Sequence, residues 1–107
     1  MKIIALQASP RKGGNCDVLM DEMIKGIEEN GGEVVKYYLE SQEIAPCKAC
    51  MYCAENPECV RADDGNEILD ELVAADGVIF ATPIYYGQMS AQGKLIIDRF
   101  YSIGQNP

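Results

Sequence analysis

Four of the five cysteines lie close together in the middle of the chain, and they have the chemistry of a metal-binding site. Their spacing is Cys47-x2-Cys50-x2-Cys53-x5-Cys59, which places four thiols within residues 47–59. Four thiolates so close together can wrap a cubane iron–sulfur cluster. The spacing therefore predicts that Cys47, Cys50, Cys53 and Cys59 ligate one 4Fe–4S cluster.

Other uses of the same cysteines remain open on the sequence alone. Structural zinc usually takes two separated Cys pairs, which differ from this triple spacing. Disulfides are typical of oxidising compartments, although oxidation after the loss of a cluster would also join these thiols. Reduced cysteines can also pack simply as small apolar residues. The fifth thiol, Cys16, stands apart and is interpreted as part of a different loop.

A Gly-rich segment, residues 9–16 (S-P-R-K-G-G-N-C), follows the first apolar run of the chain. Glycines let backbone N–H groups turn inward, and the N-terminus of a following helix adds further free N–H groups and its dipole. The pattern is neither G-x-G-x-x-G nor a Walker loop, so a phosphomonoester fits better than a dinucleotide. A generic turn before a capped helix is the alternative. The candidate phosphate contacts are Ser9, Arg11, Lys12, Gly14, Asn15 and Cys16.

A second segment, residues 82–90 (T-P-I-Y-Y-G-Q-M-S), follows the third apolar run. A tyrosine ring here can offer a flat apolar face to a planar ligand, and the glycine allows close approach of the backbone. The alternative is that the paired tyrosines simply cover the end of a strand. The candidate ligand contacts are Pro83, Ile84, Tyr85, Tyr86 and Gly87.

The elements that position these loops alternate between strands and helices. Short apolar runs predict strands over residues 2–8, 34–39 and 77–82. Residues 83–89 are expected to form a loop. Apolar residues at helical spacing predict helices over residues 16–30, 64–75 and 90 to about 103, the first capped by Asn15 or Cys16.

This alternation indicates an α/β fold with a right-handed parallel sheet. We expect three strands in the order 2-1-3 with helices on both faces. Such sheets bind ligands at the carboxyl ends of their strands, and both candidate loops fall there. The whole of 1–107 is expected to be a single domain with a cysteine-rich loop at 46–60.

Several motifs resemble those of a known family. The segment S-P-R-K-G-G-N is similar to the FMN phosphate loop of the NAD(P)H-dependent FMN reductase and flavodoxin-like group. The segment T-P-I-Y-Y-G resembles the family's [ST]-P-x-Y-x-G loop beside the isoalloxazine ring, and K-L-I-I-D-R resembles the helix that follows it. The cysteine spacing resembles that of the iron–sulfur flavoprotein branch. The family usually has Ser or Thr where this chain has Cys16, a weaker donor to phosphate.

The resemblance implies FMN and a 4Fe–4S cluster as cofactors, an electron donor such as a ferredoxin-like protein or NAD(P)H, and a homo-oligomer. It implies an electron-transfer flavoprotein, an oxidoreductase in which no side chain is assigned as catalytic. A cluster-free NAD(P)H-dependent FMN or quinone reductase is the alternative. A non-enzymatic flavin-binding module, or a metal-binding module built on the four cysteines, is a further one.

Composition excludes some partners and predicts the compartment. A net charge of −8 argues against nucleic acid, because phosphate affinity needs clustered Lys and Arg. The chain has no His, which removes the commonest general base. No apolar run approaches the roughly 20 residues that span a bilayer, and the start of the chain lacks a secretory signal pattern. We expect a cytoplasmic protein without membrane partners.

The third strand leads to a prediction about assembly. Flavodoxin-like sheets have five strands in the order 2-1-3-4-5, so this domain resembles one that lacks the last two. Residues 78–82 carry no charge and no proline, unlike protected edge strands. We therefore expect this edge to be covered by a second subunit or by a further half of the domain.

Overall fold

Three parallel strands form the centre of the computed structural model, which describes residues 1–105. The strands are β1 (Lys2–Gln7), β2 (Glu33–Tyr38) and β3 (Gly77–Ala81), and their order in the sheet is β2-β1-β3. Ile4 of β1 is in register with Val35 on one side and with Val78 on the other. The predicted strand order is confirmed.

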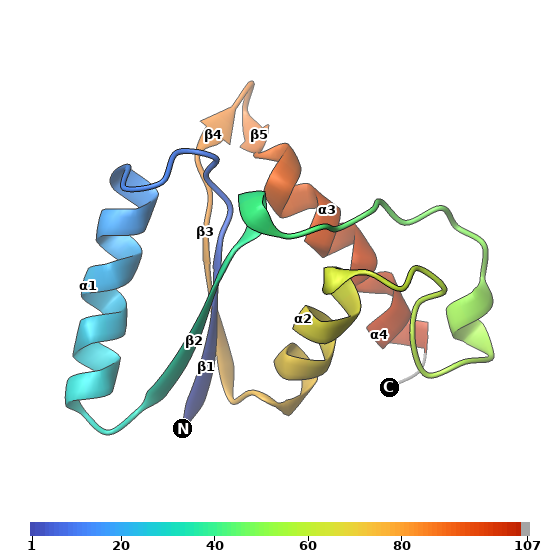
Figure 1. Cartoon of the computed structure of the whole chain (residues 1–107), viewed down its shortest axis with the longest axis horizontal. Helices are drawn as coiled ribbons and strands as arrows, with labels where there is room; N and C mark the ends of the chain where they lie inside the picture. The colour runs from blue at the N-terminus through green and yellow to red at the C-terminus, as the bar shows by residue number, and fades with distance from the viewer. Residues whose placement is uncertain (106–107) are drawn as a thin grey trace.

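Helices cover both faces of this sheet (Figure 1). The helix α1 (Asn15–Glu29) lies on one face. The other face is covered by α2 (Asp64–Ala74), α3 (Ala91–Arg99) and α4 (Tyr101–Gln105). The predicted α/β fold, a parallel sheet with helices on both faces, is therefore confirmed.

The larger core lies between the sheet and α2 and α3. Successive residues of a strand point to opposite faces, so Ile4 and Leu6 share the face toward these helices. They pack there in one buried cluster with Ile68, Leu69 and Ile96. Burying each such side chain contributes about 1.5–3 kcal/mol, so this cluster fixes α2 and α3 against β1.

Four elements differ from the sequence-based expectation. The segment after β3 is a hairpin of β4 (Ile84–Tyr85) and β5 (Gln88–Met89) rather than a loop. Gly14, not Asn15 or Cys16, is the N-cap of α1. The third predicted helix ends at Arg99, and α4 follows it after Phe100. Two short 3-10 turns, η1 (Leu39–Ser41) and η2 (Tyr52–Ala54), were not predicted, and η1 begins at the last residue of the predicted second strand.

The strand β3 forms one edge of the sheet within residues 1–105. Its residue Val78 is 54% exposed, and no residue of β3 is fully buried. The cover predicted for this edge stays a prediction. Among the described residues, no helix is long and apolar enough to cross a membrane.

Candidate functional site

Both loops singled out in the sequence lie at the carboxyl end of the sheet, at the top of Figure 1. The segment 9–14 joins β1 to α1, and the hairpin β4–β5 joins β3 to α3. Ser90 ties the two together. Its Oγ donates to the Ala8 carbonyl oxygen at 2.6 Å and accepts from the Gly93 N–H at 3.2 Å. Because Ser90 is fully buried, this contact fixes the start of α3 against the end of β1.

The segment 9–14 is held by hydrogen bonds between residues that are close in sequence. The Ser9 Oγ accepts from the Arg11 N–H at 3.1 Å, and the Gly14 N–H donates to the Arg11 carbonyl oxygen at 3.3 Å. Gly13 has a φ of +78°, a conformation that costs any residue with a Cβ. The glycine therefore allows the turn that brings the chain to the start of α1.

The carboxylate of Asp17 stabilises this turn. Its Oδ1 accepts from Lys36 Nζ at 2.7 Å, and its Oδ2 accepts from the Gly13 N–H at 2.6 Å. The Lys36 hydrogen bond and then the Gly13 N–H lower the pKa of Asp17, and these effects outweigh its burial. Lys36 also pairs with Asp21 at 2.8 Å, so one lysine of β2 holds two carboxylates of α1.

The remaining side chains of this segment surround the start of α1. Arg11, Lys12 and Asn15 are exposed, Cys16 is half-buried and Ser9 is buried. The first N–H groups of a helix have no carbonyl partner within the helix. These groups and the two basic side chains make a place where an anion can bind. All six candidate phosphate contacts are thus brought together.

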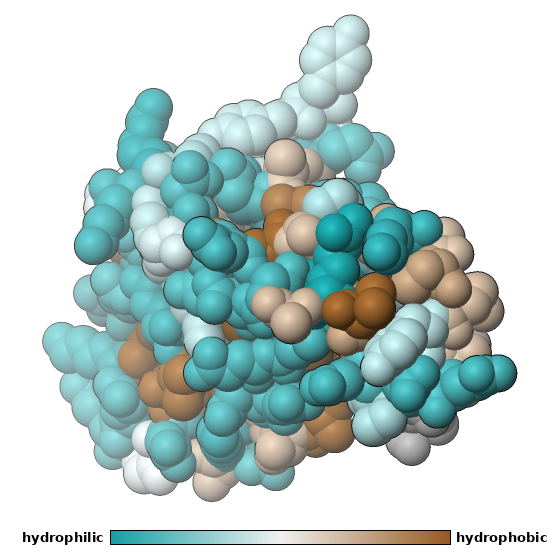
Figure 2. All heavy atoms as spheres, turned by 45° about the vertical axis from the view of Figure 1, so that its right-hand side comes forward, coloured by the Kyte–Doolittle hydropathy of each residue, from teal (hydrophilic) through white to brown (hydrophobic). Residues whose placement is uncertain are grey.

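The hairpin extends the same end of the molecule. Tyr86 has a φ of +53° and Gly87 a φ of +76°, as in the type I′ turns that suit tight hairpins. The Thr82 Oγ1 accepts from the Ser90 N–H at 2.9 Å and so closes the base of the hairpin. Ile84, Tyr85 and Tyr86 are exposed, and the hairpin rises above the surrounding surface (Figure 2). Its apolar side chains are free to contact a ligand or another chain.

The cysteine-rich loop lies elsewhere, beyond α2 and α4 at the right of Figure 1. Cys47 and Cys50 are exposed, Cys59 is half-buried and Cys53 is buried. All four line one small cavity of about 20 Å³, together with Val60, Arg99 and Tyr101 among others. Within residues 1–105, no three Cys, Asp or Glu side chains are grouped closely enough to hold a single metal ion. The structure therefore brings the four thiols to one cavity without bringing their sulfurs to one point.

Two residues of this loop have left-handed backbones. Ala49 has a φ of +56° and Met51 a φ of +66°, on either side of Cys50. Such conformations cost residues with a Cβ of the order of 1 kcal/mol, and they cluster at ligand-binding sites. The Tyr101 hydroxyl, from α4, reaches the Met51 Sδ at 3.5 Å. Ala49 and Met51, on either side of Cys50, are thus held in backbone conformations that are intrinsically unfavourable for these residues.

The base of the cysteine loop is held by a buried ion pair. Arg99 Nη1 donates to Asp63 Oδ2 at 2.8 Å, and the Arg99 side chain is 1% exposed. Burial alone would raise the pKa of Asp63, but the hydrogen bonds from Arg99 and the Ala45 N–H lower it overall. The Asp63 Oδ1 also accepts from the Gly65 N–H at 2.9 Å and so caps α2. One carboxylate therefore serves the loop and the helix together.

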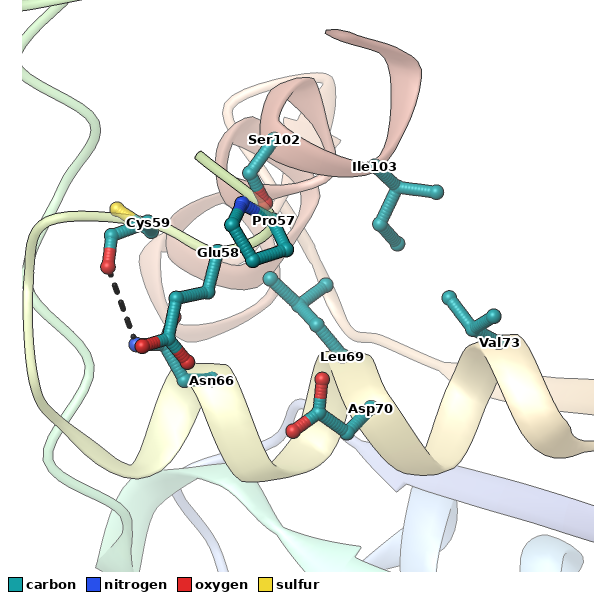
Figure 3. Close-up of a pocket in the computed structure, with 9 residues that line it drawn as sticks. All are labelled: Pro57, Glu58, Cys59, Asn66, Leu69, Asp70, Val73, Ser102 and Ile103. Carbon is teal, nitrogen blue, oxygen red and sulfur yellow. Dashed lines mark hydrogen bonds between the residues drawn. The ribbon is translucent and has the colours of Figure 1, made fainter. Parts of the chain in front are cut away.

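A larger cavity of about 210 Å³ lies on the other side of Cys59, between the loop, α2 and α4 (Figure 3). Leu69 and Val73 of α2 and Ile103 of α4 line it. The Cys59 carbonyl oxygen accepts from Asn66 Nδ2 at 3.3 Å, while the Cys59 sulfur points away from this cavity. This cavity, whose apolar walls come from α2 and α4, is therefore separate from the one that the four cysteines share.

Sequence reasoning assigned no site role to three residues that organise the two sites. Arg99 carried a signal, because it is a charged residue that follows Leu95 and Ile96 in a stretch of apolar helical spacing. Asp63 carried one as a typical helix N-cap residue. Asp17 gave none, because a first-turn acid is expected on any helix.

The family model described as NADPH-dependent FMN reductase matches residues 1–107. The chain belongs to this family. Both candidate loops and the parallel sheet that carries them are therefore parts of an FMN reductase-like fold.

Curated relatives in this family include an iron-sulfur flavoprotein of Methanosarcina thermophila. It is 41% identical over 99 residues, which are 92% of this chain and 52% of the relative. An iron-sulfur flavoprotein of Archaeoglobus fulgidus is 38% identical over 107 residues, which are 100% of this chain and 49% of the relative. A Bacillus subtilis protein, named as an NAD(P)H-dependent FMN-containing oxidoreductase, is 32% identical over 107 residues, 100% of this chain and 56% of its own. The chain spans about half the length of these relatives.

Solved structures support the same fold. A flavone reductase superposes with a TM-score of 0.72 at 28% identity, covering 94% of this chain and 30% of its own. A Klebsiella pneumoniae protein described as a quinone reductase gives a TM-score of 0.72 at 24% identity, covering 97% of this chain and 46% of its own. The second likeness shows the fold alone.

Proposed function

We propose that this chain forms the FMN-binding part of an electron-transfer flavoprotein that also holds a 4Fe–4S cluster. The observation that carries the proposal is the separation of two sites on one FMN reductase-like scaffold. One site is the pair of loops at the carboxyl end of the sheet, and the other is the cavity lined by four cysteines. The similarity to iron-sulfur flavoproteins of Methanosarcina thermophila and Archaeoglobus fulgidus supports the same assignment.

The FMN phosphate belongs at the start of α1 in this proposal. The first-turn N–H groups of α1 and the Ser9 hydroxyl supply donors, and Arg11 and Lys12 supply positive charge. Pro83, Ile84 and the two tyrosines of the hairpin offer apolar faces for the flavin ring. Gly87, which has a φ of +76°, carries no side chain and so would let a ring approach the hairpin backbone closely.

The cluster belongs on Cys47, Cys50, Cys53 and Cys59. Zinc would need all four sulfurs at about 2.3 Å from one point. A cubane instead takes one thiolate on each of its four irons, so its sulfurs surround a larger volume. The four cysteines that line one cavity would supply one thiolate for each of the four irons. The donor set of four cysteines is the one that a 4Fe–4S cluster takes.

Together the two cofactors would supply electron transfer. The cluster would carry one electron at a time, and the flavin would accept or donate one or two electrons. A ferredoxin-like carrier or NAD(P)H is the proposed donor. Within one chain the cysteine loop and the flavin loops lie at different places on the fold (Figure 1). A homo-oligomer, in which the cysteine loop of one subunit approaches the flavin loops of another, is therefore part of the proposal.

Anaerobic purification followed by iron, sulfide and flavin assays tests this function. We expect about four irons and four sulfides per chain, as a cubane requires, and one FMN. Cys50→Ser should remove the iron and keep the flavin. Cys16→Ser is the matched control, because Cys16 lies at the start of α1 and should leave the iron unchanged. Zinc in place of iron, or iron that survives loss of Cys50, would refute the cluster.

A cluster-free NAD(P)H-dependent FMN or quinone reductase is the second candidate. The Bacillus subtilis relative favours it, since that protein is named as an NAD(P)H-dependent FMN-containing oxidoreductase. Under this alternative, NADPH would bleach the bound flavin in a preparation without iron, and the Cys50→Ser variant would be fully active. Stopped-flow absorbance of the flavin distinguishes the two candidates.

A further inference from the structure

One positive charge is fully buried beside the four cysteines. The Arg99 side chain is 1% exposed and lines the same cavity as Cys47, Cys50, Cys53 and Cys59. Arginine is almost never buried unless it is paired. The burial of Arg99 at the end of α3 must therefore be explained by the groups to which it bonds.

Arg99 joins the two ends of the cysteine loop. Its Nη1 donates to the Ala45 carbonyl oxygen at 3.0 Å, just before the loop begins. Its Nη2 donates to the Arg61 carbonyl oxygen at 3.3 Å, just after the loop ends. A second contact works alongside it, because Arg61 Nε donates to the Pro46 carbonyl oxygen at 2.7 Å. The planar guanidinium thus bridges two backbone segments that Lys could not bridge with the same fork.

Two side chains at the N-terminal end of α2 hold the guanidinium in this orientation. Asp63 Oδ2 accepts from Nη1 at 2.8 Å, and Asn66 Oδ1 accepts from Nη2 at 3.0 Å. The same Asn66 donates through Nδ2 to the Cys59 carbonyl oxygen at 3.3 Å. The backbone of Cys59 is therefore connected to Arg99 through Asn66.

One donor of Arg99 is left over. Its Nε–H is buried and has no hydrogen-bond partner within the part of the chain that the structure describes. A buried donor without an acceptor is unfavourable, and sulfur atoms in the adjoining cavity would be acceptors for it. Four thiolates in one cavity also repel one another, and a buried cation reduces that repulsion.

We propose that Arg99 is a positioning residue for the four-cysteine centre, which closes the base of the loop and places a fixed positive charge beside the thiolates. This inference rests on the proposed function, since it takes the cysteines to hold a 4Fe–4S cluster. One-electron reduction by dithionite adds a negative charge to such a cluster. Arg99 is paired with Asp63, but Arg99 lines the cysteine cavity and Asp63 is not among the residues that line it. The positive end of this pair would therefore stabilise the reduced cluster and raise its midpoint potential.

Anaerobically purified wild-type protein and three variants test the role of Arg99. Arg99→Met removes the charge and the donors, and Arg99→Lys keeps the charge without the fork. Lys94→Met is the matched control, because Lys94 lies on the same helix and pairs with Asp98 at the surface. Each protein is assayed for iron per flavin, for the midpoint potential and for the EPR signal of the dithionite-reduced cluster.

We expect Arg99→Met to lower iron per flavin several-fold and to shift the potential of the remaining cluster downward. Arg99→Lys should keep a potential near that of wild type with less iron, and Lys94→Met should match wild type throughout. Wild-type iron and potential in Arg99→Met would overturn the inference while leaving the proposed function standing. Wild-type protein without iron and sulfide would instead refute the proposed function itself.

Unfolding of Arg99→Met would not leave the inference undecided. The double variant Asp63→Asn/Arg99→Met removes both charges of the pair, so no lone charge stays buried. We expect it to lose iron as well, because the bridge between Ala45 and Arg61 is gone. Wild-type iron in that variant would overturn the inference. If it too fails to fold, Arg99→Lys decides, and wild-type iron content and an unchanged EPR signal there count against Arg99.

Discussion

The flavin-end loops and the cysteine loop are held in place in opposite ways. The segment 9–14 is short, and its shape comes from Gly13, a nearby carboxylate and the start of a long helix. The cysteine loop runs over residues 46–60 with a single 3-10 turn. Its ends are bridged by Arg99, which lies far along the chain, and by the contact between Arg61 and Pro46. The turn of the first region is thus formed mainly by residues close in sequence, whereas the ends of the second are joined by a residue far along the chain.

One helix connects the two regions. Ser90, at the start of α3, bonds to the end of β1 beside the flavin loops. Arg99, at the end of the same helix, bonds to both ends of the cysteine loop. A helix is rigid over nine residues, so α3 fixes the positions of the two regions relative to each other.

The largest effect should come from breaking the ion pair at the base of the cysteine loop. Asp63→Ala leaves Arg99 buried without its carboxylate and removes the cap of α2. Removing one partner of a buried pair typically costs about 3–5 kcal/mol, and we expect that loss in the free energy of unfolding by urea. Asp64→Ala is the control, because the Asp64 Oδ2 accepts from the exposed Glu43 N–H at 2.7 Å and not from a buried cation. Equal losses in the two variants would show that the pair has no special weight.

The same contrast decides what the sequence could predict. The strand order, the helices and the place of both flavin-end loops followed from apolar periodicity and from glycines, which act locally. The hairpin β4–β5 was missed, because Tyr86 adopts φ of +53° in a turn that usually has Asn or Asp there. The Arg99–Asp63 pair joins residues 36 apart in the chain, and no pattern in either segment specifies that pairing.

A smaller effect is expected at the flavin end, where side chains contribute one contact each. Arg11→Ala and Asn15→Leu should each weaken FMN binding by about 1–3 kcal/mol, as loss of a charge-assisted contact does. Fluorescence titration of FMN measures this, and iron content should not change. Lys25→Ala, near the far end of α1, is the control for charge alone. Unchanged FMN affinity in both loop variants would move the phosphate away from this loop.

Acid should weaken both regions in the same direction. The pKa values of Asp17 and Asp63 are both lowered in the folded protein, by Lys36 and by Arg99 respectively. Each group therefore contributes stability above the ordinary aspartate pKa of about 3.9, and that stability is lost as the pH falls toward the lowered value. Urea unfolding between pH 6 and pH 3 should show this fall, and Asp17→Asn should flatten part of it. A wild-type curve with no fall below pH 4 would contradict both ion pairs.

The smallest effects should separate a glycine that the flavin end requires from one that the fold merely tolerates. Gly87 has a φ of +76°, so Gly87→Ala should cost about 1 kcal/mol by strain. Gly26 lies in the interior of α1, and a Cβ added there would meet nothing within 4 Å. Gly26→Ala should therefore stabilise the protein by about 0.5–1 kcal/mol, because alanine loses less conformational entropy in a helix. Thermal unfolding measures both, and FMN affinity should fall only for Gly87→Ala. We expect the two substitutions to change the stability with opposite signs. If Gly87→Ala caused no loss of stability, the hairpin would accept alanine without strain. The left-handed turn through which Gly87 is proposed to approach the ring would then not be needed.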